Sequence, residues 1–174
     1  MTTKYNRYLD WQPITDSIDS SKNLTILEFG CGEGTTHLIN TFKYVCSYET
    51  NSRDRDGKWF NYTQSQNIDK NWAGYFDKSF PNIDIDINKF KSNVLNTIDM
   101  SAFDVLFVDP GFKQRAACVI EFAKLLHFKY IFVHDTRTEP LLYEWRLLEN
   151  MPVQYKLHAE ITTGQGTKLW KLTK

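Results

Sequence analysis

The chain carries no net charge, and none of its apolar runs is long. Its 21 Lys and Arg residues balance its 21 Asp and Glu residues. A neutral chain lacks the broad positive surface that attracts nucleic acids or anionic membranes. No apolar run approaches the ~20 residues that a helix needs to cross a bilayer, so we expect no membrane association. The N-terminal residues are polar and charged, unlike a secretory signal peptide.

Cysteine is scarce as well. Cys31, Cys46 and Cys118 are odd in number, and they match neither a Cys-x-x-Cys motif nor the spacing of a zinc site. Unpaired thiols are typical of a reducing compartment, so we expect a cytoplasmic protein. The 174 residues contain no linker, internal repeat or low-complexity segment. This length suits one domain with a substantial core, and no pattern indicates an oligomeric state.

Short apolar runs alternate with amphipathic segments along the chain. Near-continuous apolar runs are typical of parallel strands that are buried on both faces. The strands expected on this basis are residues 24–28, 44–49, 103–109 and 130–133. The helices expected from caps and from apolar spacing of three and four are residues 35–42, 116–126 and 139–149. Strands that alternate with helices predict a doubly wound, mostly parallel α/β sheet.

Other segments give weaker patterns. Residues 83–87 alternate strictly between Ile and Asp, which predicts a half-exposed third strand. Residues 59–67 and 72–80 are expected to form a helix and a loop. Residues 155–161 and 168–172 flank a Gly-rich turn, which predicts a C-terminal hairpin with an antiparallel strand.

The stretch Leu24-Thr-Ile-Leu-Glu-Phe-Gly-Cys-Gly-Glu-Gly-Thr35 is the most informative part of the chain. A strand is followed by a glycine-rich turn and then by a helix, which is the nucleotide-binding arrangement of doubly wound folds. Glycine lets the backbone turn sharply and approach a ligand closely. The order E-x-G-x-G-x-G resembles the first motif of class I S-adenosylmethionine-dependent methyltransferases. That resemblance implies a seven-stranded Rossmann-like sheet with an antiparallel strand near the C-terminus, and S-adenosylmethionine as the cofactor.

The resemblance also implies cofactor-binding residues. Glu28 matches the acid beside the turn, and the glycines that wrap the methionine half of the cofactor are Gly30, Gly32 and Gly34. Glu49, at the end of the second strand, matches the acid that binds the two ribose hydroxyls. A carboxylate suits a cis diol because it accepts two hydrogen bonds.

The adenine-binding residues stay open. Asp86 and Asn88 both fit the position that contacts adenine after the third strand, and Trp59 is a candidate for stacking on the ring.

Acidic residues end the fourth and fifth expected strands. Asp109 and Asp135 fall at the carboxyl edge, where doubly wound folds bind ligands. In the catechol O-methyltransferase-like branch, acids at these positions bind a divalent metal, so the resemblance implies that Asp109 and Asp135 hold Mg²⁺ or Mn²⁺. That branch has Asn where this chain has Thr136, which leaves metal dependence open. Asp109, His134 and Asp135 are the candidate catalytic residues, with His134 or Asp109 as the base.

The resemblance favours an O-methyltransferase that acts on a small hydroxylated acceptor, a sugar or sugar conjugate. Arg115 and Arg137 follow the two acids and are candidates for orienting a polar acceptor. Residues 1–23 carry aromatics at every third position from Tyr5 to Trp11, before Pro13 breaks the pattern. We expect this segment to form a helical lid and residues 24–174 to form a single Rossmann-like methyltransferase domain.

Three alternatives stay open. Asp109-Pro-Gly-Phe112 resembles the Asp-Pro-Pro-Tyr/Phe signature of nucleic-acid amino methyltransferases, but it lacks the second proline. The neutral charge also argues against a nucleic-acid partner. The glycines together with Glu49 also fit an NAD-dependent oxidoreductase. The altered strand-end residues would suit a catalytically silent cofactor-binding protein.

Overall fold

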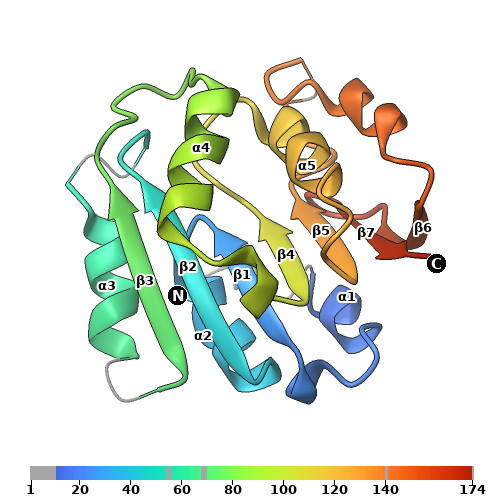
Figure 1. Cartoon of the computed structure of the whole chain (residues 1–174), viewed down its shortest axis with the longest axis horizontal. Helices are drawn as coiled ribbons and strands as arrows, with labels where there is room; N and C mark the ends of the chain where they lie inside the picture. Colours follow the sequence, from blue (N-terminus) through green and yellow to red (C-terminus); the bar gives the residue numbers. More distant parts are fainter. Residues whose placement is uncertain (1–10, 54–55, 68–69, 140, 174) are drawn as a thin grey trace, which may run out of the picture.

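A seven-stranded sheet forms the centre of the molecule (Figure 1). The structure is a computed structural model and describes residues 11–53, 56–67, 70–139 and 141–173. The spatial order of the strands is β3-β2-β1-β4-β5-β7-β6. Their bounds are β1 Thr25–Phe29, β2 Tyr44–Thr50, β3 Trp72–Asp77, β4 Val105–Val108, β5 Tyr130–His134, β6 Tyr155–Ile161 and β7 Thr167–Leu172.

The strands from β3 to β5 are all parallel, and β7 lies antiparallel between β5 and β6. This arrangement confirms the predicted doubly wound, mostly parallel sheet with an antiparallel C-terminal strand. The central strands β1, β4 and β5 are buried along nearly their whole length. Burial on both faces explains why their sequences are almost continuously apolar.

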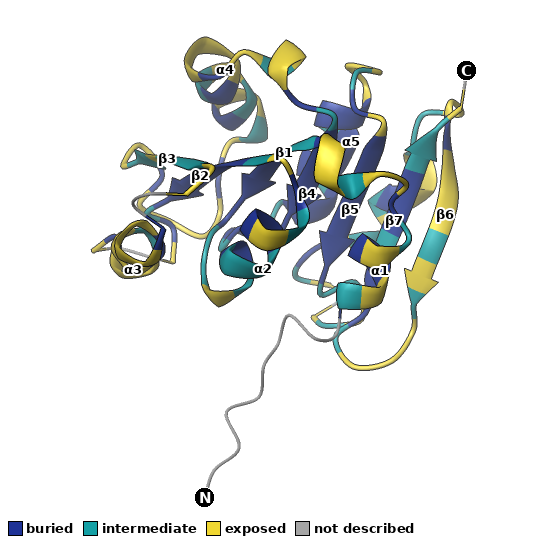
Figure 2. Ribbon diagram, turned by 90° about the horizontal axis from the view of Figure 1, so that it is seen from below, coloured by how far each residue is buried: buried dark blue, intermediate teal, exposed yellow. Residues whose placement is uncertain are grey.

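Helices cover both faces of the sheet (Figure 2). One face is covered by α1 (Gln12–Asp16), α2 (Glu33–Thr41) and α3 (Lys58–Gln66). The other face is covered by α4 (Ile87–Thr97) and α5 (Arg115–Ala123). Short 3-10 helices are η2 (Ser21–Asn23), η3 (Met100–Ala102) and η4 (Trp145–Asn150). No helix of the described part combines the length and the apolar character that a membrane crossing requires.

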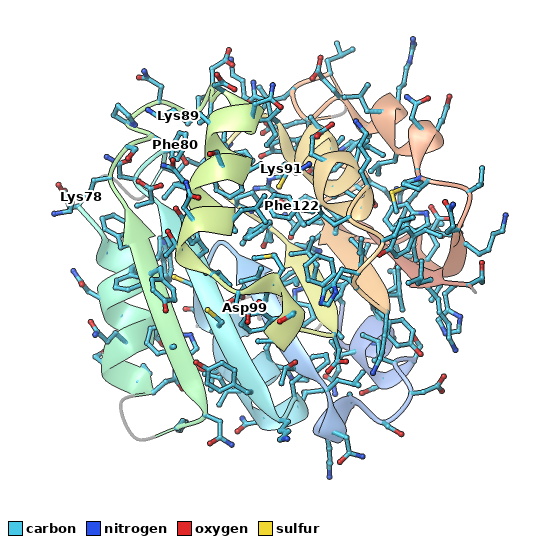
Figure 3. All side chains as sticks on the ribbon, viewed as in Figure 1. Lys78, Phe80, Lys89, Lys91, Asp99 and Phe122 are labelled. Atoms are coloured by element: carbon cyan, nitrogen blue, oxygen red, sulfur yellow. The ribbon has the colours of Figure 1, made fainter. Side chains whose placement is uncertain are left out.

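A phenylalanine cluster fills the core between the sheet and the helices α4 and α5. The ring of Phe29 on β1 lies 5.2 Å from that of Phe90 and 4.8 Å from that of Phe122, measured between centroids. Phe122 comes from α5 and lies in the region between α5 and α4 (Figure 3). On the surface above it, Lys91 of α4 forms an ion pair with Glu121 of α5 at 3.2 Å. Buried aromatic rings at these separations fix α4 and α5 on the sheet.

The core on the opposite face of the sheet includes residues near the N-terminal end of the described chain. Trp11, Ile14 and Ile18 are almost fully buried and pack in one cluster with apolar residues of β1, α2 and β4. The Trp11 ring lies 5.2 Å from the ring of Phe107. Pro13 does not end a helix here, because it lies in the first turn of α1, where a missing N–H is tolerated. The predicted helix over Tyr5 and Tyr8 lies outside the described residues.

The third strand is not where the alternation of residues 83–87 predicts it. Those residues form a bend in which the Ile83 carbonyl accepts a hydrogen bond from the Lys113 N–H and the side chain of Asp86 caps α4. The actual strand is β3, in the segment 72–80 that was expected to be a loop. No residue of β3 is fully buried. An edge strand of this kind lacks the apolar run that marks the central strands.

The prediction of a helix over residues 139–149 is wrong for the first half of this range. Glu139 and Glu144 have left-handed backbone conformations, with φ of 43° and 53°, and among the described residues of this range only those of η4 are helical. The helices predicted for residues 35–42, 59–67 and 116–126 are present with shifted bounds. The first begins at Glu33 rather than Thr35, because Gly32 is its N-cap.

Candidate active site

A cavity of about 310 Å³ opens at the carboxyl edge of the central strands. The eight residues predicted for the site all line it: Glu28, Gly30, Gly32, Gly34, Glu49, Asp109, His134 and Asp135. The cavity is also lined by Trp11, Arg53, Trp59, Arg115 and Gln165. No sequence pattern points to Arg53 or Gln165, which come from loops. The structure thus brings the glycine-rich turn and both strand-end acids to one cavity.

Gly30 is the tightest point of the site. Its φ is +87°, and a Cβ atom there would lie 2.4 Å from the carbonyl oxygen of Asp109. The two strand ends are also hydrogen-bonded, because the Asp109 N–H donates to the Phe29 carbonyl at 2.9 Å. Only glycine fits such a contact. The turn after β1 and the turn after β4 are therefore one packed unit.

Gly32 occupies a different environment. Its backbone is extended, and the nearest atom to an added Cβ would be a ring carbon of Trp59 at 3.9 Å. The space beside Gly32 is therefore open within the protein and belongs to the cavity. The Gly32 N–H donates to the hydroxyl of Thr35 at 3.0 Å, which holds the start of α2.

Glu28 lies beneath the turn in a buried chain of hydrogen bonds. Its carboxyl group accepts from the Ser47 hydroxyl at 2.6 Å and from the Thr35 hydroxyl at 2.9 Å. The Trp72 indole N–H in turn donates to Ser47 at 2.8 Å. Burial raises the pKa of Glu28 to about 8, although the hydrogen bonds from Ser47 and Thr35 act in the opposite direction. Glu28 thus ties β1 to β2 and α2 and is largely protonated at neutral pH.

Glu49 connects the end of β2 to the glycine-rich turn. One carboxylate oxygen accepts the Cys31 N–H at 2.8 Å, and the other accepts the Thr50 N–H at 2.7 Å. The residue is 6 % exposed. Each carboxylate oxygen has a second lone pair, so the predicted binding of ribose hydroxyls stays compatible with these contacts.

Asp109 and Asp135 lie on either side of the guanidinium of Arg115. A single Arg115 nitrogen, Nη1, lies 2.7 Å from Asp109 Oδ1 and 2.8 Å from Asp135 Oδ2. The Arg115 side chain is 4 % exposed, against 33 % for Asp109 and 15 % for Asp135. Burial raises the pKa of Asp109 even though Arg115 and His134 lie nearby. Asp135 has a left-handed φ of 64°, a strained conformation of the kind found at functional sites.

His134 lies behind the two acids. Its Nδ1 is 3.0 Å from the Thr167 hydroxyl, its Nε2 is 3.2 Å from the Gln165 side-chain oxygen, and the residue is 4 % exposed. These contacts fix the ring between β5 and β7 and leave it less accessible than Asp109.

The residues present do not fit the expected Mg²⁺ or Mn²⁺ site. The guanidinium of Arg115 lies between the two carboxylates that would ligate the ion. No group of three or more potential ligands among His, Cys, Asp and Glu occurs in the described part of the chain. Two carboxylates that share a buried cation are already neutralised in part, so the attraction for a second cation is weak.

The adenine candidates are only partly placed at the cavity. Trp59 of α3 lines it. Asp86 accepts hydrogen bonds from the N–H groups of Asn88 and Lys89 as the N-cap of α4, outside the cavity. The acid that ends β3 is Asp77, which lines a separate groove. The choice of Asp86 or Asn88 followed from the misplaced third strand.

The fold resembles those of solved methyltransferases. No protein-family model matches the chain, and no curated protein matches it. One similar structure is Sp1610 of Streptococcus pneumoniae, described as a candidate tRNA (m1A22) methyltransferase in complex with S-adenosyl-L-methionine. It is 12 % identical to this chain with a TM-score of 0.59, and the match covers 98 % of this chain and 73 % of Sp1610. The N-methyltransferase NodS of Bradyrhizobium japonicum, bound to S-adenosyl-L-homocysteine, is 12 % identical with a TM-score of 0.61, over 97 % and 87 %.

The S-adenosylhomocysteine-bound methyltransferase PaMTH1 of Podospora anserina is 10 % identical with a TM-score of 0.57, over 98 % of this chain and 89 % of its own. At these identities the likeness concerns the fold. The chain has the fold of class I S-adenosylmethionine-dependent methyltransferases, as the resemblance of its first motif predicts.

Replacing Gly30 by Ala should destabilise the protein strongly. The new Cβ would clash with the Asp109 carbonyl, and the positive φ is unfavourable for alanine. We expect a loss of at least about 2 kcal/mol in the free energy of unfolding, measured by urea denaturation. Gly32→Ala is the matched control and should lose less than about 1 kcal/mol. Equal losses in the two variants would contradict the proposed contact.

The stability of the protein should fall as pH rises towards 8 because of Glu28. The raised pKa means that the folded state keeps a proton that the unfolded state releases above pH 4.5. The stabilisation of the folded state by neutral Glu28 is complete below the pKa of Glu28 in the unfolded chain. It is lost as pH rises through the pKa of Glu28 in the folded protein, at up to about 1.4 kcal/mol of unfolding free energy per pH unit. In urea denaturation between about pH 5 and pH 8, the free energy of unfolding of Glu28→Gln should not show this decrease with pH. Parallel curves for the two proteins would mean that Glu28 is ionised in the folded state.

Proposed function

We propose that this protein is an S-adenosylmethionine-dependent methyltransferase. The observation that carries the proposal is the convergence of the glycine-rich turn, Glu49 and two strand-end acids on one cavity. The fold is shared with structures that hold S-adenosylmethionine or S-adenosylhomocysteine. Glu49 would accept hydrogen bonds from the ribose hydroxyls. The open space beside Gly32 would admit the methionine half of the cofactor.

The acceptor we propose is a small hydroxylated molecule, a sugar or sugar conjugate. Its oxygen would attack the sulfonium methyl group in line, the methyl–sulfur bond would break, and S-adenosylhomocysteine would leave. The hydroxyl proton would pass to a carboxylate. Asp109 suits this step best, because it is the more exposed of the two strand-end acids at the cavity. Asp135 and His134 are less accessible and would hold the site in position.

The N-terminal segment contributes to the same site. Trp11 lines the cavity while its ring packs on that of Phe107. Ile14 and Ile18 pack in the core instead, so among residues 11–23 only Trp11 lies at the cavity, and the predicted lid over residues 1–23 stays a prediction for its first ten residues. Residues 1–10 lie outside the described part of the chain.

A nucleic-acid acceptor is the second candidate. The expectation that nucleic acid is not a partner finds no support in the comparisons, since Sp1610 is described as a candidate tRNA methyltransferase. One contact argues against the amino-group signature at residues 109–112. Phe112 is fully buried, with its ring 5.0 Å from that of Phe90, so it is not available to stack on a base.

The cofactor can be tested directly by calorimetry. We expect saturable binding of S-adenosylmethionine and S-adenosylhomocysteine and none of NAD. Glu49→Ala should weaken binding by about 1.5–3 kcal/mol, the range for hydrogen bonds to a charged group. Asp77→Ala removes the acid that ends the neighbouring strand and should leave affinity unchanged. NAD binding without a response to S-adenosylhomocysteine would refute the proposed cofactor.

The acceptor can be tested by following methyl transfer from labelled S-adenosylmethionine to sugars, phenols, tRNA, rRNA and amines. We expect products from hydroxyl acceptors. Asp109→Asn should lose most of the turnover and keep its affinity for S-adenosylhomocysteine, because the base acts only in the transition state. Products from nucleic acid alone would replace the sugar proposal, and no product from any acceptor would favour a silent cofactor-binding protein.

A further inference from the structure

The most unusual group at the cavity is the buried guanidinium of Arg115. Arg115 is the first residue of α5, and its backbone N–H donates to the Lys113 carbonyl at 2.8 Å. Its Nη1 bridges the Asp109 and Asp135 carboxylates at 2.7 and 2.8 Å. An arginine is almost never this deeply buried unless it is paired, because removing the charge from water is costly. The two acids are therefore the reason that Arg115 can lie here.

A second layer holds the guanidinium in place. Its central carbon lies 4.3 Å from the centroid of the Tyr143 ring, a cation–π contact. Tyr143 is 3 % exposed, and its hydroxyl accepts a hydrogen bond from Arg53 at 3.2 Å. The cation is thus fixed by two carboxylates and an aromatic face that come from three different segments. The guanidinium of Arg115 is therefore an integral part of the site.

The two carboxylates also depend on the cation. Asp109 and Asp135 come from adjacent strands, and both contact one nitrogen atom. Two carboxylates this close repel each other, and one of them would become protonated without a counter-ion. A divalent metal is the usual solution when oxygen ligands converge. Here a protein side chain supplies the positive charge.

We propose that Arg115 is a built-in cation that takes the place of a divalent metal between Asp109 and Asp135, so that this site works without metal. Arg115 acts as a positioning residue: it keeps the two carboxylates in place and leaves the second oxygen of Asp109 for the acceptor hydroxyl. This role rests on the proposed methyltransferase function. The occupancy of the acid pair by Arg115 can be tested independently of it.

The test is titration of the full chain with Mn²⁺, followed by electron paramagnetic resonance and calorimetry. Wild type should show no saturable binding at the acid pair. Arg115→Ala should gain a site at least about tenfold tighter than any in wild type, because two converging carboxylates then lack a cation. Adding Asp135→Asn to that variant should remove the new site. Arg115→Lys, which keeps a cation, should bind no Mn²⁺.

Arg137→Ala is the matched control. Arg137 lies two residues after Asp135, is exposed, and donates to the Thr162 carbonyl rather than to the acids. Its removal takes away the same charge and should create no Mn²⁺ site. Arg115→Met, which keeps much of the side-chain volume, replaces Arg115→Ala if the latter does not fold.

Two results would overturn the proposal. One is saturable Mn²⁺ binding to wild type that Asp109→Asn abolishes, and the other is a folded Arg115→Ala or Arg115→Met that gains no site. Wild-type turnover should be unaffected by a chelator, whereas the turnover lost in Arg115→Ala should be partly restored by Mg²⁺. S-adenosylhomocysteine binding is measured on the same samples. Its absence from wild type would refute the proposed function and leave the Mn²⁺ result to decide the role of Arg115.

Discussion

The backbone contact between Gly30 and Asp109 is the constraint on which the site depends. The two residues end neighbouring parallel strands, and the space between them has no room for a Cβ atom. A shift of either turn would therefore move the other. The turn proposed to bind the cofactor and the acid proposed to accept the proton share one packed unit. Alignment of donor and acceptor groups within such a unit is what a displacement reaction needs.

Near this contact the protein buries two ionisable groups in different ways, one in its neutral form and one in its charged form. Glu28 accepts hydrogen bonds from the hydroxyls of Ser47 and Thr35, and burial raises its pKa and favours the neutral form. Arg115 stays charged because two carboxylates and an aromatic ring surround it. Both groups lie at the edge of the same cavity. Glu28 stabilises the start of α2 beneath the glycine-rich turn, and Arg115 fixes the acids on the other side.

The errors of sequence interpretation have one physical origin. Apolar periodicity reports which residues are buried but does not report what buries them. In residues 83–87 only Ile85 is buried, and it packs into the core from a bend, so the alternation does not mark a strand. The edge strand β3 has no fully buried residue, so it resembles a loop. The adenine prediction for Asp86 and Asn88 depends on a third strand at residues 83–87. Because β3 ends at Asp77, these two residues do not follow it directly.

The sequence alone determined the fold class and predicted eight of the residues that line the cavity, but it did not point to Arg53 or Gln165. Parallel strands present their carboxyl ends at one edge of the sheet, which places the glycine-rich turn, Glu49, Asp109 and Asp135 on the same side of the molecule. Only the tertiary structure decided how these groups are paired. Arg115 lies six residues beyond Asp109 and twenty before Asp135, and nothing in that spacing shows that the first turn of α5 directs its side chain between them. Pairing depends on the position of a helix over the sheet, which packing sets and local sequence does not encode.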